Sequence, residues 1–439
     1  MIRRNRMLTR RRVLGAGLAG LLPAACRPVS DAPSGPTPEP AGPTIGDPNI
    51  APLLVASPGD SEIARPVLVE FTRQNPSLLA RWEKVEGDFT AVLEARLATA
   101  SAPDVVRVRE GQIGRWRHAG LLAGFGNDEL FEQLPALLYA GARAGTFDPD
   151  GVPWGVPHYH DAMFLAYNSA HLGRVGGRVP ETLEELAGFA RELQARHSLR
   201  SPVSINLAPK ANANLPWWGL LKAAAVSFEQ TEAGVSEAAA VLDALRAMVV
   251  EDGTLDPGIE RPDYDRLADG DCAFAIVGAY SGPRLQSAGA PIAFAPLPGV
   301  SGPGRRSVCW TPAFALASRP QPHPAGARLA VHLGSIDKSG EFWGPRHFAL
   351  SGSLPPAYPG LLRDSSVSAH FRRWVDPGVL NSVLEQAAPV DFLWQPWFQP
   401  WEHRCQELVM DAVLGQTEPV AAAMQMWSDA ATYGDSTDS

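Results

Sequence analysis

Acidic and aromatic side chains are the residues of this 439-residue chain whose types and positions could do chemistry. Glu110 and Asp161 each stand just off an apolar run typical of a strand, and the chain has 12 Trp against 7 Tyr and 16 Phe. Paired carboxylates can hydrolyse a glycoside, or they can accept charge-assisted hydrogen bonds from hydroxyl groups. Indole rings can cover the apolar faces of a sugar ring. The alternative is that these are solvated surface acids and core tryptophans.

Spacing divides the tryptophans between core and site. Trp218 follows another Trp at a helix start, and because adjacent helical residues face different sides, at most one of the two reaches a ligand. Trp394, Trp397 and Trp401 fall on one helical stripe, a pattern typical of a core. We keep Trp218, Trp310 and Trp401 as candidate ligand contacts.

The histidines and cysteines do not predict a metal or a cofactor. His158 and His160 precede Asp161, but zinc needs three or four ligands and no second ligand pair stands elsewhere. Cys272 and Cys309 border apolar strands, where they are either inert thiols or an oxidised pair.

Alternating strand and helix patterns position the candidate residues in the first part of the chain. The periodicity predicts strands over 51–56, 79–85 and 105–108, with helices over 61–74 and 89–99 between them. This alternation predicts a mainly parallel, doubly wound α/β sheet, whose ligands bind outside the C-terminal strand ends. Those ends carry Asp60, Ser61, Phe89, Arg109 and Glu110.

Further strands are predicted over 162–167, 273–277, 292–296 and 313–317. Between them, Thr182 is predicted to cap a helix, with Glu185 completing a capping box.

The N-terminal segment has the pattern of an export signal. Residues 1–25 carry six Arg and no acid, then an apolar core from Val13 to Leu22 and the small residues before Cys26. A basic amphipathic surface helix is the alternative. Arg10-Arg11-Arg12 resembles the twin-arginine motif, and the residues around Cys26 resemble a lipoprotein box, although Pro23 stands where Leu is usual. Lipidation of Cys26 and simple signal cleavage both remain open.

Residues 26–50 predict an extended tether, because they hold seven prolines and cannot bury apolar surface. Without the leader, 32 basic residues face 47 acidic ones, a net charge of −15. That charge argues against nucleic-acid binding. No apolar stretch is long enough for a membrane-spanning helix, so any membrane attachment is through a lipid at Cys26.

Motifs along nearly the whole chain after residue 51 resemble the extracellular solute-binding proteins of ABC importers, in the maltodextrin and glycerophosphate-binding branch. They are Ser101–Val106 (SAPDVV), Ala119–Leu122 (AGLL), Gly151–Asn168 (GVPWGVPHYHDAMFLAYN), Pro180–Leu186 (PETLEEL), Leu267–Ile276 (LADGDCAFAI) and Ala295–Gly299 (APLPG).

This resemblance implies a two-lobed periplasmic-binding-protein type II fold, two doubly wound α/β lobes joined by hinge strands. Lobe one is expected over 51–158 plus 291–335, and lobe two over 159–290 plus 336–439. A ligand between the lobes closes them, and an importer recognises the closed form.

The resemblance also implies which residues meet the ligand. Added to the candidates above, they are Tyr159, His160, Asp161, Tyr280, Ser281, Trp310, Thr311, Ser353 and Glu402. Only Arg109 and Arg284 stand as cations near the matching positions, so a neutral sugar is favoured over a phosphorylated ligand.

The hypothesis is therefore a carbohydrate-binding importer subunit, a monomer acting with permease subunits, without catalysis or cofactor. It is expected to be extracytoplasmic, either lipid-anchored at the cell membrane or periplasmic. One alternative keeps the fold and changes the ligand to a polyamine, another non-sugar solute or a glycerophosphodiester. A glycoside hydrolase is the alternative from another class, and no hydrolase signature supports it.

Overall fold

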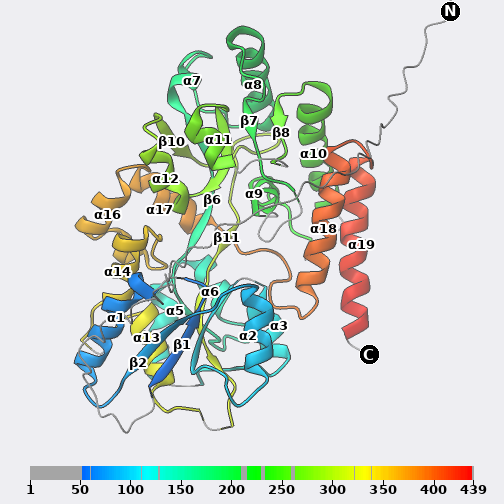
Figure 1. The fold of residues 1–439 in the computed structure, drawn as a ribbon. Helices are drawn as coiled ribbons and strands as arrows, with labels where there is room; N and C mark the ends of the chain where they lie inside the picture. Colours follow the sequence, from blue (N-terminus) through cyan, green and yellow to red (C-terminus); the bar gives the residue numbers. More distant parts are fainter. Residues whose placement is uncertain are drawn as a thin grey trace, which may run out of the picture. The chain divides into compact units, whose positions relative to one another are not determined.

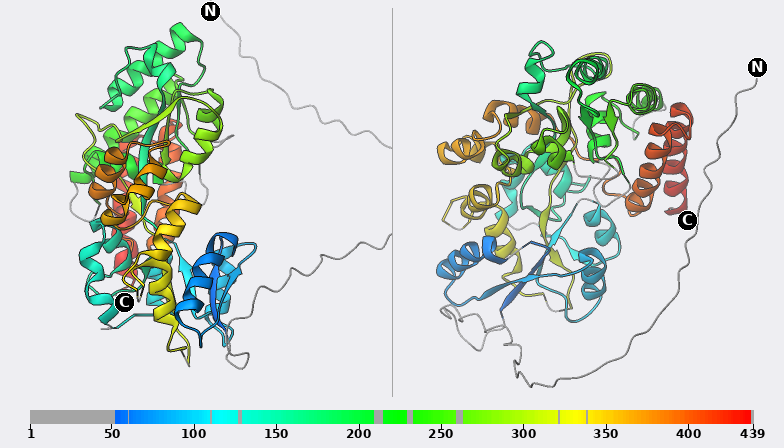
Figure 2. Two further views of the ribbon diagram at one scale, coloured as in Figure 1. Left: turned by 90° about the vertical axis from the view of Figure 1, so that its left-hand side faces the viewer. Right: turned by 45° about the horizontal axis from the view of Figure 1, so that its top comes forward.

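Two six-stranded sheets organise the part of the chain that the computed structural model describes. The described residues are 52–437 except 60, 110, 127–128, 209–214, 229–232, 259–262, 321 and 338. The predicted leader, the tether and Cys26 lie outside them. Figures 1 and 2 show helices on both faces of each sheet, so the α/β fold class is confirmed.

The first sheet has the strand order β2-β1-β3-β12-β4, with β5 paired to β12. Its strands are β1 (Leu53–Ser57), β2 (Ala80–Lys84), β3 (Val105–Val108), β4 (Leu122–Ala123), β5 (Val156–Pro157) and β12 (Ala313–Ala317). Strands β1, β2 and β3 run in one direction, and β4 and β5 share it because each pairs antiparallel with β12, as β3 does. The first sheet is therefore mainly parallel, as expected, and within it β12 is the reversed strand, because it enters after the chain has passed through the second sheet.

Strand alternation places helices on both faces of the first sheet. Val55 and Val105 pack into one apolar cluster, while Ala56 and Val106 pack into another on the opposite face. The helices of this half are α1 (Ser61–Gln74), α2 (Phe89–Leu97), α3 (Gln112–His118), α4 (Glu129–Glu132), α5 (Leu134–Leu137), α6 (Ala140–Thr146), α13 (Gly326–Gly334) and α14 (Trp343–Gly352).

The second sheet has the order β10-β6-β9-β7-β8, with β11 paired to β6. Its strands are β6 (Asp161–Asn168), β7 (Val203–Ser204), β8 (Leu255–Asp256), β9 (Phe274–Gly278), β10 (Ile292–Ala295) and β11 (Cys309–Trp310). The remaining helices are α7 (Ser169–Gly173), α8 (Leu183–His197), α9 (Leu215–Ala223), α10 (Ala233–Arg246), α11 (Asp263–Asp269), α12 (Gly282–Ser287), α15 (Pro359–Leu362), α16 (Ser365–Phe371), α17 (Pro377–Gln386), α18 (Phe398–Val413) and α19 (Pro419–Thr437), with the π-helix η1 (Ala247–Glu251) and the 3-10 turn η2 (Ala279–Ser281).

Local capping at α8 follows the sequence. The Thr182 hydroxyl accepts the amide of Glu185 at 3.1 Å. The Glu185 carboxylate reaches back one residue further than a capping box requires, to the amide of Glu181 at 2.8 Å.

Two lobe boundaries differ from the prediction. Strand β10 was expected in lobe one, but it pairs with β6 along its whole length in the second sheet. Helix α14 was expected in lobe two, but it packs on α1 and α13 beside the first sheet. In both cases the partner is distant in sequence, so local periodicity carries no information about it.

Two antiparallel segments connect the sheets, and they pair with each other. Residues 156–162 run from β5 into β6, and residues 309–314 run back from β11 into β12. Their register joins Ala162 to Cys309 and Pro157 to Ala313, and the amide of His158 donates to the carbonyl of Pro312 at 2.7 Å. We call these two paired segments the hinge.

The core of the second lobe encloses two predicted ligand residues. Trp218 is 1% exposed and Trp401 is 0% exposed. Their ring centroids lie 5.7 Å apart, with Phe228 and Phe392 against them, and the Trp401 indole donates to the carbonyl of Met426 at 2.9 Å. A sugar ring has no access to either indole face, so the prediction for Trp218 and Trp401 is wrong; both are core residues.

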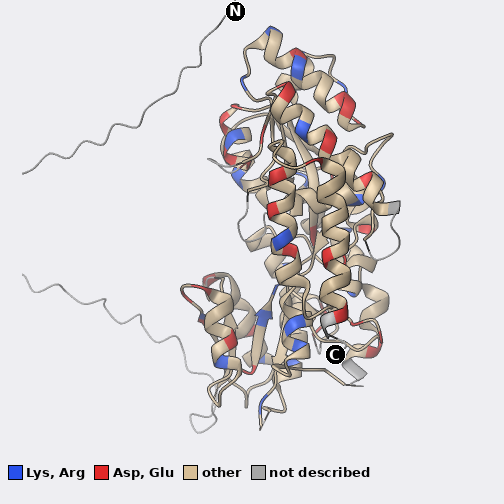
Figure 3. Ribbon diagram, turned by 90° about the vertical axis from the view of Figure 1, so that its right-hand side faces the viewer, with Lys and Arg blue, Asp and Glu red and all other residues tan. Residues whose placement is uncertain are grey.

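Figure 3, viewed toward α18 and α19, shows acidic and basic residues interspersed rather than gathered into a basic face. Among the described residues, no helix combines the length and apolar character that crossing a membrane requires.

The core position of Trp401 generates a stability prediction. Trp401→Ala should lower the free energy of unfolding by about 3–5 kcal/mol, because it leaves a large cavity. Trp427 on α19 is 37% exposed, and the matched Trp427→Ala change should cost about 1 kcal/mol or less. Urea denaturation followed by circular dichroism measures both. Equal losses would contradict this assignment of the core.

Candidate functional site

The hinge carries five of the predicted ligand residues on its two segments. Tyr159, His160 and Asp161 stand on the outgoing segment, and Trp310 and Thr311 stand on the returning one. Trp310 is the register partner of Asp161. The pairing brings residues about 150 positions apart into one cluster, as the prediction required, although their side chains then take different roles.

Asp161 is a bracing residue inside the hinge. Its carboxylate is 0% exposed and accepts the amides of Ala162 at 2.8 Å, Ala279 at 3.1 Å and Tyr280 at 2.9 Å. Burial raises the pKa of Asp161 to about 7, while the three amide donors act in the opposite direction. The predicted ligand contact is corrected: Asp161 instead fixes the turn that presents Tyr280.

A side-chain hydrogen bond between His160 and Thr311 joins the two hinge segments. The Nδ1 atom of His160 lies 2.8 Å from the Thr311 hydroxyl, and its ring stacks on Tyr139 at 5.5 Å. His160 is 0% exposed and Thr311 is 6% exposed. Burial lowers the pKa of His160 to about 4, so the ring is neutral at physiological pH. Both side chains therefore hold the hinge together and are enclosed, contrary to the predicted ligand contact.

Tyr280 supplies an accessible aromatic ring that stands against the buried Trp310. Tyr280 is 47% exposed and its ring stands edge-on to Trp310, with centroids 6.1 Å apart. Gly278 allows this approach, because a Cβ there would lie 2.6 Å from the Trp310 ring. Trp310 itself is 5% exposed, so Tyr280 offers most of the free aromatic surface.

Tyr159 adds a second ring and brings a cation that the sequence analysis missed. Tyr159 is half-buried, and the Arg107 guanidinium carbon lies 5.7 Å from its ring centroid. The Nε of Arg107 donates to Nδ1 of His158 at 3.1 Å. Burial, aided by the charge of Arg107, holds the pKa of His158 well below its usual value, which keeps this acceptor neutral. Arg107 lies within the predicted strand, so only tertiary pairing could reveal it.

The C-terminal edge of the first sheet contributes Phe89 and Arg109. Phe89 opens α2, is buried, and has the Arg109 guanidinium carbon 5.6 Å from its ring centroid. Ser61 opens α1 and is exposed. The two carboxylates predicted at this edge, Asp60 and Glu110, lie outside the described residues.

The other predicted residues serve local structure. The Ser281 hydroxyl is buried and donates to the carbonyl of Gly278 at 2.6 Å. Ser353 ends α14 in a left-handed conformation, φ 53°, with its hydroxyl 3.0 Å from Nε2 of His370. Glu402 is half-buried on α18. Arg284, the other cation considered from sequence, is paired with Asp265 at 2.9 Å.

Within the described ranges, no group of three His, Cys, Asp or Glu side chains is arranged to hold a metal ion. Cys272 is a buried thiol outside any disulfide, so the oxidised pair with Cys309 is not formed.

Comparison with solved structures defines the fold class. The GacH receptor of Streptomyces glaucescens, solved unliganded and with acarbose, superposes with a TM-score of 0.71 at 16% identity over 87% of this chain and 97% of its own. UgpB of Mycobacterium tuberculosis with glycerophosphocholine gives 0.72 at 16% over 89% and 100%. An ABC transporter solute-binding protein of Thermotoga lettingae with α-D-tagatose gives 0.69 at 17% over 86% and 98%. No protein-family profile matches the chain.

The chain therefore has the two-lobed fold of ABC-transporter solute-binding proteins, which confirms the fold expected from the motifs. At these identities the likeness establishes the fold.

The buried carboxyl of Asp161 generates a pH prediction. Its pKa is raised from 3.8 in the unfolded chain to about 7 in the folded one, so the folded state binds the extra proton between these values. The contribution of Asp161 to the free energy of unfolding should therefore fall as pH rises from 4 to 7, whereas the lowered pKa values of His158 and His160 act in the opposite direction. Asp161→Asn should remove this part of the decline, at a cost of roughly 1–3 kcal/mol for the disrupted amide contacts.

Denaturation at several pH values measures the slope, with the exposed Asp150→Asn as the control. Asp263, whose pKa burial also raises to about 7, keeps its own part of the slope in every variant. A slope unchanged by Asp161→Asn would contradict the assignment.

Proposed function

We propose that this protein is the extracytoplasmic solute-binding subunit of an ABC importer, and that it captures a carbohydrate between its lobes. The observation that carries the proposal is the exposed Tyr280 ring set against Trp310 at the hinge. An aromatic face at this point can cover one face of a sugar ring, and closure about the hinge would enclose the other.

The ligands of similar folds agree with this chemistry. The related structures carry acarbose and tagatose, which are polyhydroxylated. Tyr159 and Tyr280 supply accessible rings, and each ring carries a polar hydroxyl. The ligand would gain apolar contact from the rings and hydrogen bonds from groups on both lobes.

A glycerophosphodiester is the second candidate, and Arg107 favours it. Only the Nε of Arg107 has a hydrogen-bond partner within the described part of the chain, namely His158. The terminal guanidinium nitrogens could bind a phosphodiester in a bidentate manner. UgpB, solved with glycerophosphocholine, has a similar fold.

The polyamine and hydrolase alternatives are less well supported. A polyamine needs accessible carboxylates, whereas Asp161 is enclosed and Arg107 and Arg109 bring positive charge to the described part of the site. A glycosidase needs two carboxyl groups facing the substrate. The Asp161 carboxylate already accepts hydrogen bonds from three backbone amides and does not face a substrate. We therefore propose a non-catalytic protein.

Export and attachment complete the proposal. Residues 1–25 would direct export, Cys26 would carry a lipid, and residues 26–50 would hold the lobes away from the membrane. The closed monomer would then deliver its ligand to permease subunits.

A ligand panel tests the proposed function. Calorimetry with mono- and oligosaccharides, glycerophosphocholine and polyamines should detect binding of a saccharide. Tyr280→Ala should weaken it about tenfold, because it removes a ring face worth about 1 kcal/mol or more. Trp427→Ala, a distant exposed aromatic, is the matched control. Binding only of amines, or release of a hydrolysis product, would refute the proposal.

Arg107 distinguishes the two ligand classes. For a neutral sugar, Arg107→Gln should change the affinity by about threefold or less, since no charge is paired. For glycerophosphocholine the same change should cost about 10- to 100-fold, because a charge-assisted contact is lost. Arg328→Gln serves as the control, since Arg328 is an exposed arginine of α13 that belongs to neither set of site residues. A large loss of sugar affinity in Arg107→Gln would overturn the preference for a neutral ligand.

A further inference from the structure

A cavity of about 580 Å³ lies beside the hinge, apart from the aromatic site. Arg305 and Arg306 line it from the loop that leads into β11, and Asp391 and Trp394 line it from the segment before α18. Ala144 of α6 contributes from the first lobe. Neither Tyr159 nor any other aromatic residue of the proposed sugar site belongs to this lining.

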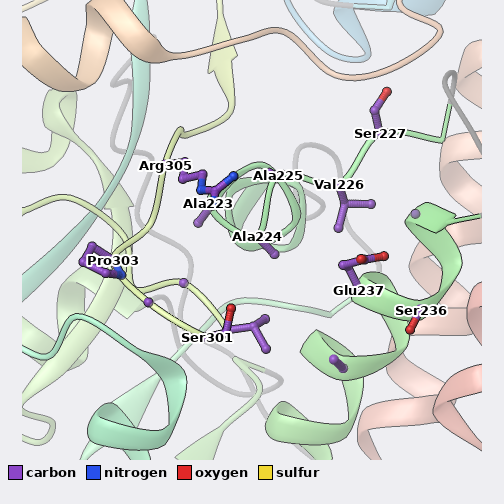
Figure 4. A pocket seen from close by; sticks show the side chains of 15 residues that line it. Ala223, Ala224, Ala225, Val226, Ser227, Ser236, Glu237, Ser301, Pro303 and Arg305 are labelled. Carbon is purple, nitrogen blue, oxygen red and sulfur yellow. The ribbon is translucent and has the colours of Figure 1, made fainter.

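A neighbouring cavity of about 510 Å³ shares Arg305 and the stretch Ala225–Ser227 with the cavity beside the hinge. Figure 4 shows Arg305 on one side of this neighbouring cavity and Glu237 on the other. Arg305 therefore lines both of these cavities, and Arg306 lines the one beside the hinge.

Among the described residues, the lining of the cavity beside the hinge carries more positive than negative charge. Lys222 and Asp391 are both buried and form an ion pair, so they neutralise each other. The second carboxylate oxygen of Asp391 accepts the amide of Phe228 at 2.7 Å. Arg305 and Arg306 are exposed, and neither side chain has an ion pair within the described residues. Two arginines without an ion-pair partner among the described residues thus line one cavity in a chain whose net charge is −9.

We propose that this cavity binds a small polyanion through its phosphate or carboxylate oxygens. Guanidinium groups present planar pairs of N–H donors that match such oxygens, and the paired Asp391 offers little repulsion. A volume of about 580 Å³ suits a metabolite-sized ligand. The site is separate from the sugar site, so the inference goes beyond the proposed function.

The position of the cavity links it to the hinge. The amide of Cys309 donates to the carbonyl of Ala388 at 2.9 Å, and the amide of Ala388 donates to the carbonyl of Ser307 at 3.0 Å. Three residues after Asp391, the Trp394 indole donates to the carbonyl of Ala144 at 2.9 Å. An anion on Arg305 and Arg306 therefore contacts a segment tied to both lobes. Any effect on the affinity of the cleft ligand must be reciprocal.

Calorimetry at low salt tests the proposal, with inorganic pyrophosphate and citrate as the phosphate and carboxylate probes. The wild-type protein should bind at least one of them at a single site. Arg305→Ala/Arg306→Ala should weaken binding about 10- to 100-fold, because charged hydrogen bonds are lost. Arg305→Lys/Arg306→Lys keeps the charge and should lose less.

Arg65→Ala/Arg328→Ala is the matched control, because both residues are exposed arginines of α1 and α13 and the charge change is equal. This control and Tyr280→Ala should bind the probe as the wild type does. Unchanged thermal unfolding midpoints establish that each variant folds. Absence of binding to both probes, or an equal loss in the control, would overturn the proposal, and neither result depends on which solute the aromatic site takes.

Discussion

The antiparallel pairing of residues 156–162 with residues 309–314 is the interaction on which the rest of the structure depends. Each segment belongs to both sheets, so the pairing sets how the first sheet meets the second. It also explains why one strand of the first sheet is reversed, since β12 enters from the hinge and runs against β3. Two paired strands have few backbone bonds compared with a full sheet, which leaves the hinge as the natural place for the lobes to rotate.

Hydrogen bonds from buried polar side chains stabilise the hinge, where there are few backbone hydrogen bonds. Asp161 gathers three amides, and His160 meets Thr311 across the two segments. Such groups are costly to bury unless they are satisfied, so they define one geometry and disfavour others. The consequence for the site is indirect. Asp161 holds the turn that carries Tyr280, and the ring of Tyr280 is what remains accessible.

The segment before α18 restrains the lobes from the other side. Asp391 ties it to Lys222 and Phe228, whereas Trp394 ties it to Ala144 only three residues later. A rotation of the lobes has to be absorbed within this short stretch or has to loosen one of its contacts. The proposed anion cavity borders the same stretch, which is why a ligand there and a ligand at Tyr280 would share one conformational equilibrium.

Local pattern in the sequence was enough for many of the longer helices and strands of this protein, although the two-residue strands β4, β5, β7 and β8 were not predicted. Helix α1 begins at Ser61 and ends at Gln74 as predicted, β3 spans Val105–Val108, and Thr182 caps α8, because periodicity and capping act within a few residues. Tertiary structure alone decided which candidates are accessible. It enclosed Asp161, put Trp218 against Trp401, and set Arg107 over Tyr159, 52 positions away. Burial and long-range contact depend on how distant segments pack, and no local pattern encodes that.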